Sequence, residues 1–126
     1  MIDILLNIGS FLLDSFKNQA AMDNAQNQNV QEALFKIGDL LESVAHDLED
    51  GVFPHGKCAE MDMLSKHLAD ALEGDLDENY LEILKNNLNS AVEIEKMYAY
   101  KDDPNQIQKI KITAGYFKAA AILANI

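Results

Sequence analysis

The sequence predicts an all-α protein, an up-down bundle of four main helices plus an N-terminal helix, in a single domain over residues 1–126. Apolar residues recur at intervals of three and four along most of the chain, which is the period of an α-helix. No run of alternating β-branched residues reaches the length of a strand. Cap residues, glycines and prolines lie where this periodicity stops, so they separate the helices by short links.

The N-terminal segment carries an apolar seam that predicts a helix. The seam consists of Ile2, Leu5, Leu6, Leu12, Leu13, Phe16 and Ala20, whereas Ile4, Ile8 and Phe11 lie off it. We expect Gly9 and Ser10 to split this segment into a short leading piece and a longer helix from about residue 10 to residue 25. The Asn- and Gln-rich stretch 18–29 then covers a helix end and the following link.

Two further helices are predicted on either side of Gly51. The first begins at a capping box, in which the Asn29 side chain accepts hydrogen bonds from first-turn amides and the Glu32 side chain reaches back to the Asn29 amide. Its apolar stripe is Val30, Ala33, Leu34, Ile37, Leu40, Leu41, Val44 and Leu48. The second begins between residues 55 and 58, without a Ser, Thr, Asp or Asn cap before it, and ends at Gly74. Its stripe is Cys58, Met61, Leu64, Leu68 and Ala71.

The last two helices have clearer starts. A cap at residues 75–78 precedes the stripe Leu81, Leu84, Leu88, Ala91, Ile94 and Tyr98. Asp103, Pro104 and Gln106 then give a cap, a first helical residue and a third helical residue of the preferred types. The stripe that follows is Ile107, Ile110, Ala114, Phe117, Ala121 and Ala124, and it is widened by Ile112, Tyr116, Ala119, Leu123 and Ile126. We therefore expect this helix to be buried on most sides.

The charge of the chain argues against nucleic-acid binding. Ten lysines and no arginine oppose twenty-one acidic residues, which leaves a formal charge of −11. Affinity for a polyanion comes mainly from basic residues that neutralise phosphates, so such a partner would be repelled. The charge is also uneven, because residues 39–103 hold seventeen acids and five lysines, whereas residues 104–126 hold three lysines and no acid. This asymmetry favours a partner, or a second copy, that meets one charged face.

Cysteine content and hydropathy narrow the class of protein. A lone Cys58 excludes an intramolecular disulfide framework. The first residues lack a basic stretch and include Asp3, so they make a poor signal peptide. No segment reaches the ~20 apolar residues of a spanning helix. We expect a cytoplasmic protein without a membrane span.

The leading functional hypothesis is an interaction protein of the adaptor, regulator or immunity and inhibitor type, with a basic protein partner. An acidic surface facing a basic partner gives fast, salt-sensitive association. The candidate partner-binding residues are Asp39, Glu42, Glu49, Asp50, Phe53 and His55. A homodimer is a further expectation, because the two terminal segments carry more apolar surface than one bundle face uses.

The alternative hypothesis is a bundle that binds a metal or an anion at the glycine-flanked segment 51–58. Its candidate ligand-binding residues are His55, Lys57, Cys58 and His67. Imidazole and thiolate are ligands that zinc prefers, and a lysine beside backbone amides can hold an anion. His46 is expected to point away from the core, toward acidic side chains. No Glu-x-x-His pair of the di-iron type occurs, and no arrangement predicts an enzyme or a bound cofactor.

Overall fold

The computed structural model describes residues 2–17, 27–54, 56–73, 78–82, 85 and 99–124. Over these residues the protein is helical and contains no strand, which confirms the all-α class. The α-helices are α1 (Ile2–Lys17), α2 (Asn27–Glu49), α3 (Lys57–Ala71), α4 (Glu78–Glu82) and α6 (Pro104–Ala124). A 3₁₀ helix, η3 (Ala99–Asp102), precedes α6. Of these helices, none is long and apolar enough to cross a membrane.

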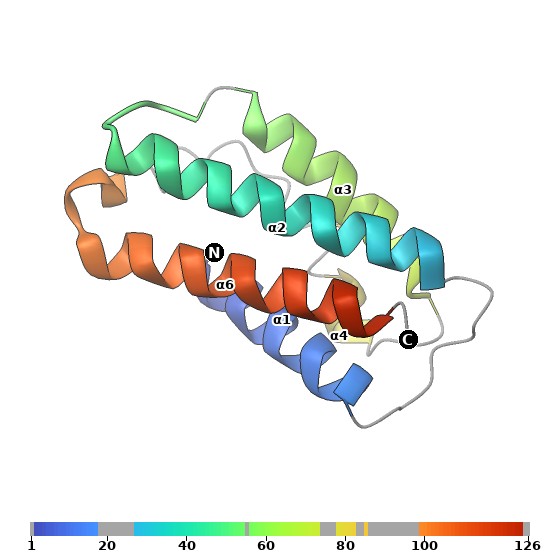
Figure 1. Cartoon of the computed structure of the whole chain (residues 1–126). Helices are drawn as coiled ribbons and strands as arrows, with labels where there is room; N and C mark the ends of the chain where they lie inside the picture. Colours follow the sequence, from blue (N-terminus) through green and yellow to red (C-terminus); the bar gives the residue numbers. More distant parts are fainter. Residues whose placement is uncertain are drawn as a thin grey trace.

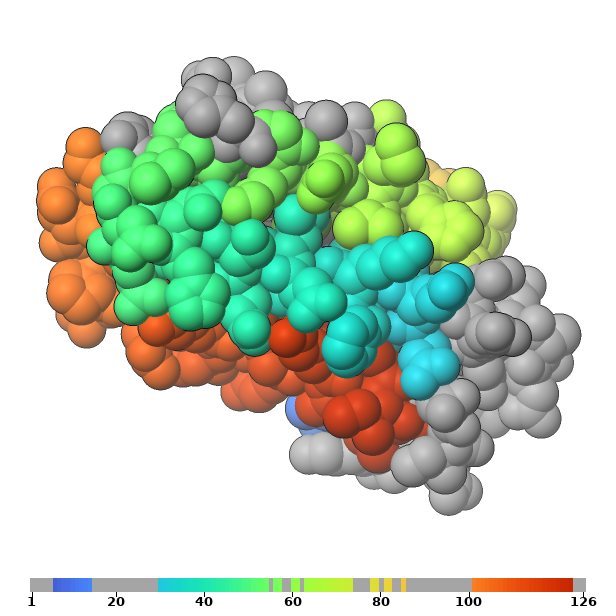
Figure 2. All heavy atoms as spheres, turned by 45° about the horizontal axis from the view of Figure 1, so that its top comes forward, coloured from blue at the N-terminus to red at the C-terminus, as the bar shows by residue number. Residues whose placement is uncertain are grey.

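The central helix of the described structure is α6. It packs against α1 on one side and against α2 on the other, and α2 in turn contacts α3 (Figure 1). The space-filling view shows α2 running between α3 and α6 (Figure 2). Ion pairs join Glu49 to Lys111 and Glu42 to Lys118, so the later of the two positions in α2 pairs with the earlier of the two positions in α6. The two helices are therefore antiparallel.

The predicted apolar stripes of α2 and α6 form most of the core. Every residue of the α2 stripe is buried, from Val30 to Leu48. The buried members of the α6 stripe are Ile107, Ile110, Ala114, Phe117 and Ala121. In α3, Met61 and Leu68 are buried, and Leu64 packs against the core from a half-buried position. These stripes were correctly read from their helical spacing.

The N-terminal helix differs from its prediction in two respects. Gly9 does not split the segment, because α1 runs unbroken through it. Ile8, which was placed off the seam, is fully buried in the core. The physical reason is the contact with α6: a methyl group at Gly9 would lie 3.2 Å from the ring of Phe117 and from Tyr116 Cβ. Glycine here permits a close helix approach, and that approach turns Ile8 inward.

A second glycine allows α6 to approach α2 closely. A methyl group at Gly38 would lie only 2.6 Å from Lys118 Cγ and 3.1 Å from the carbonyl oxygen of Ala114. The stem of Lys118 therefore crosses α2 directly over Gly38. Consecutive residues of α6, Phe117 and Lys118, thus pack on the glycines of α1 and α2.

The helix ends agree with the predictions in part. Asp103 caps α6 as expected, because its Oδ1 accepts hydrogen bonds from the amides of Asn105, at 3.1 Å, and Gln106, at 3.3 Å. The start of α3 has no side-chain cap, and Gly56 there has a left-handed φ of 76°. The capping box at Asn29 is wrong, since α2 already begins at Asn27.

One face of α6 is less buried than its composition suggested. Ile112, expected to widen the buried face, is 43% exposed, and Ile122 is 62% exposed. Tyr116, Ala119 and Leu123 are half-buried. The core needs only the side of α6 that faces α1 and α2, so the opposite side carries apolar residues that the described chain does not cover.

Several predictions lie outside the described residues. In the fourth predicted helix the structure describes α4, whose Leu81 is buried, but not the stripe positions Leu84, Leu88, Ala91, Ile94 and Tyr98. The same applies to residues 18–26 and to the side chains of Ile2, Ile4, Leu5, Phe16 and Ala124.

The approach of α1 to α6 predicts that Gly9→Val destabilises the protein. A branched side chain at this position meets the ring of Phe117, which is fully buried and cannot move away. We expect the free energy of unfolding to fall by about 1–3 kcal/mol, the usual range for overpacking. Asn7→Val, at an exposed position of the same helix, should change it by less than about 0.5 kcal/mol. Urea denaturation measures both; equal effects would contradict the close approach.

Candidate functional site

The acidic side of α2 is occupied by a lysine of α6. Lys118 Nζ lies 2.9 Å from Glu42 Oε2 and 3.0 Å from Asp39 Oδ1, one turn apart on α2. It also lies 5.6 Å from the centre of the Phe35 ring, within cation–π range. The hydrogen bond to Glu42, followed by the one to Asp39, raises the pKa of Lys118 above its ordinary value. The ammonium group therefore bridges two carboxylates. We call this line of contact between the charged sides of α2 and α6 the α2–α6 seam.

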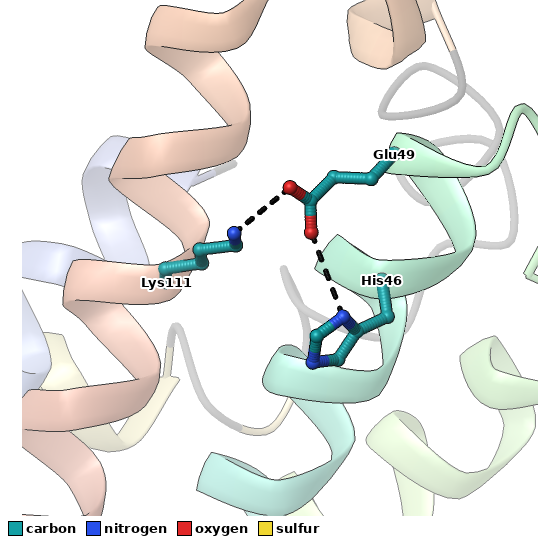
Figure 3. A network of polar contacts seen from close by, with 3 residues as sticks. All are labelled: His46, Glu49 and Lys111. Carbon is teal, nitrogen blue, oxygen red and sulfur yellow. Dashed lines mark hydrogen bonds and ion pairs between the residues drawn. The ribbon is translucent and has the colours of Figure 1, made fainter.

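A second ion pair continues this seam toward the end of α2. Lys111 Nζ lies 2.9 Å from Glu49 Oε2 (Figure 3). The other oxygen of the same carboxylate, Oε1, lies 3.5 Å from His46 Nδ1 on the preceding turn. His46 is exposed on the acidic side of α2, where the sequence placed it. Glu49 thus holds two groups at once, one from each helix.

These contacts change the interpretation of the predicted partner-binding residues. Asp39, Glu42 and Glu49 contact lysines of their own chain, so much of their charge is already compensated. Asp50 is exposed at the end of α2, and Phe53 is half-buried in the following connection. His55 lies outside the described residues.

The lysine partners were missed although the sequence holds a signal for them. Glu42 and Glu49 are seven residues apart, and so are Lys111 and Lys118. Seven residues make about two helical turns, so each pair lies on one side of its helix. Two antiparallel helices with this spacing match both pairs at once. The two ion pairs can be predicted from this spacing only when α2 and α6 are known to be neighbours.

An open groove of about 430 Å³ lies between α2 and α3, and Asp39, which contacts Lys118, stands at its edge. Its lining residues are Lys36, Asp39, Leu40, Ser43, Lys57, Glu60, Met63 and Leu64. Leu40 and Leu64 belong to the edges of the core, whereas Met63 is 72% exposed. At one end, Lys57 forms an ion pair with Asp47 and so has its charge compensated within the chain. The groove combines an apolar floor with charged sides.

This groove was not predicted from the sequence. Its signal was Met63, a large apolar residue that lies off the α3 stripe of Met61, Leu64 and Leu68. An apolar side chain on the polar face of a helix indicates a binding surface when it lies beside a groove. The groove itself depends on how α3 packs on α2, which no local pattern reveals.

The alternative ligand-binding set is not brought together by α3. Cys58 and His67 stand nine residues apart on this continuous helix, which separates their backbones by roughly 14 Å. Lys57 is engaged with Asp47, and His67 is exposed. The side chain of Cys58, like the whole of His55, lies outside the described residues. Among the residues that are described, no group of three His, Cys, Asp or Glu side chains is placed to hold a metal ion.

In comparisons with known proteins, no family model, no curated protein and no solved structure matches the chain.

Removal of the bridging ammonium group tests the α2–α6 seam. Lys118→Met keeps the apolar stem over Gly38 but leaves Asp39 and Glu42 facing each other. We expect the free energy of unfolding to fall by about 1 kcal/mol at low salt, and by less in high salt, which screens exposed charges. Lys36→Met, at an exposed position of α2, is the control and should be nearly neutral. A loss that is independent of salt would contradict the ion-pair account.

The raised pKa of Lys118 also predicts a dependence on pH. A group whose pKa is higher in the folded state stabilises fully below its unfolded pKa, and loses that contribution as the pH rises through its folded pKa. We expect the stability difference between wild type and Lys118→Met to be constant from about pH 7 to 9 and to shrink above about pH 10.5. Thermal unfolding at stepwise pH measures it; a difference that grows in alkali would contradict the assignment.

Proposed function

We propose that this chain is a small acidic helical interaction protein, of the adaptor, regulator or immunity and inhibitor type, that binds a basic protein partner. The groove between α2 and α3 carries this proposal. We place the partner there rather than on the α6 side of α2, because Glu42 and Glu49 already contact lysines of the chain.

The groove offers a partner an apolar surface that the described residues leave open. Leu40 and Leu64 form its floor, and the long, flexible side chain of Met63 stands beside them, largely in solvent. Methionine adapts its shape to different apolar groups, which suits a binding surface. A groove between two helices accepts an amphipathic helix whose apolar face packs on such a floor.

Charge defines the chemistry of the partner. The exposed acids Glu60 and Asp70 of α3, and Glu73 just beyond its end, extend from the groove along this side of the molecule. Together with the net charge of −11, they attract lysine- and arginine-rich segments over a distance. The apolar floor then holds the segment once it has arrived. We therefore propose an amphipathic basic helix as the bound element.

The proposal includes the arrangement of the whole chain as a single up-down bundle of four main helices with an N-terminal helix. The antiparallel packing of α2 and α6 supports it, as does the short connection that reverses the chain between α2 and α3. Short links between antiparallel helices are typical of this architecture.

A labelled amphipathic helical peptide of leucine and lysine tests the proposed groove by fluorescence anisotropy. We expect it to bind, and its affinity to fall by roughly tenfold or more between about 50 and 500 mM NaCl, because the attraction is electrostatic. The same peptide with glutamate in place of lysine should not bind. Salt-independent binding would contradict the charge argument.

Paired charge reversals locate the binding surface. Glu60→Lys, in the groove, should weaken peptide binding clearly more than Asp102→Lys, which makes the same charge change at the exposed end of η3. Met63→Glu makes the protein more acidic yet should also weaken binding, because it removes an apolar contact. If both lysine variants lose equal affinity and Met63→Glu gains affinity, attraction is non-specific and the groove is not the site.

A further inference from the structure

The outward side of α6 carries a second uncovered apolar surface, separate from the groove. Ile112, Gly115, Ala119 and Ile122 follow one another at spacings of three, four and three, so they share one side of the helix. We name these four residues the α6 outer face. Its two isoleucines are 43% and 62% exposed, Gly115 is exposed and Ala119 is half-buried.

Among the described residues, nothing packs closely enough on Gly115 to require a glycine there. A methyl group there would meet nothing within 4 Å, in contrast to Gly9 and Gly38, where it would meet α6. Glycine is the least favourable residue of a helix interior after proline, so a helix keeps one at a cost. The other two helical glycines described here each mark a place where a second helix comes close. By the same logic, Gly115 marks a close approach by a helix from outside the chain.

The order of residues on this face reads the same in both directions. A large residue, a small residue, a small residue and a large residue follow at symmetrical spacings. When two such helices cross antiparallel about a two-fold axis, Gly115 of one copy faces Ala119 of the other. Each Ile112 then faces the other copy's Ile122. An isologous interface requires such self-complementarity, and a partner of another sequence does not.

Charge permits two copies to meet at this face and opposes their meeting elsewhere. Each copy carries −11, so two copies repel one another at long range. From Pro104 to the end of the sequence the chain has three lysines and no acid. Lys111 and Lys118 also compensate the acids of α2 beside this face. The exposed acids of α3, by contrast, make the groove side repulsive to a second acidic chain.

We propose that the α6 outer face binds a second copy of this chain, as an antiparallel two-fold pair of α6 helices that cross at Gly115 and Ala119. Phe35 of α2, half in solvent beside Lys118, extends the apolar surface at its edge. The interface is small, so the dimer dissociates on dilution rather than being permanent. This proposal does not depend on the partner-binding groove.

Sedimentation equilibrium over a concentration series tests the dimer. The wild-type mass should rise from 14.0 kDa at low concentration toward twice that value. Gly115→Leu keeps the net charge and has room within the monomer, but it blocks the close crossing, so it should weaken the dimer by roughly tenfold or more. Asn105→Leu, at an exposed position on the first turn of α6, is the control and should leave the mass curve unchanged. A wild type that stays at 14.0 kDa throughout overturns the proposal.

Disulfide trapping tests the geometry independently of any loss of stability. In a Cys58→Ser background, Ile112→Cys combined with Ile122→Cys should give a covalent dimer under air oxidation, because the two positions face each other across the axis. Either cysteine alone should give much less. A wild-type dimer without such trapping, and insensitive to Gly115→Leu, would place the interface elsewhere and overturn the assignment.

Salt separates this proposal from the proposed groove. Screening of the repulsion between two copies should strengthen the dimer as NaCl is raised, whereas binding of the cationic peptide should weaken. Gly115→Leu should leave peptide binding intact, and Glu60→Lys should leave the dimer intact or stronger. A variant that abolishes both together would mean that the two surfaces are one, which contradicts the assignment to α6.

Discussion

The packing of α6 between two glycines is the constraint on which the rest of the described structure depends. Phe117 packs against Gly9 of α1, and the stem of the next residue, Lys118, crosses Gly38 of α2. If α1 moved outward, it would open a space beside a fully buried aromatic ring, and if α2 moved outward, it would separate Gly38 from the stem of Lys118. The same approach brings the ammonium of Lys118 to the carboxylates of α2. Phe117 and Lys118 therefore determine how closely the helices approach, how the core packs there and where the charges of α2 and α6 meet.

This arrangement gives the two sides of the molecule different character. The lysines of α6 compensate acids of α2 along the seam, so little net charge remains there. The surface around α3 keeps its exposed acids and an open apolar groove. We propose that a chain of net charge −11 thus offers one surface to a basic partner and another to a copy of itself. The uneven charge along the sequence is the origin of both.

The helices were predictable because the spacing of the apolar residues in each helix identifies the side that is buried. The stripe of α2 and the Asp103 cap of α6 required nothing beyond local sequence. Ile8 and Gly9 were misread because their environment is made by a helix more than a hundred residues away. The groove, and the lysine partners of Glu42 and Glu49, depend on which helices are neighbours. Local patterns specify elements, whereas surfaces between elements require their packing.

Native-state hydrogen exchange of the wild-type protein tests the central position of α6 most directly. If α1 and α2 are both built on it, the amides of α6 from Ala114 to Ala121 open only when the whole chain unfolds. We expect them to exchange most slowly among the described helices, with the same dependence on denaturant as global unfolding. Exchange of these amides through local opening, while α2 stays protected, would contradict the account.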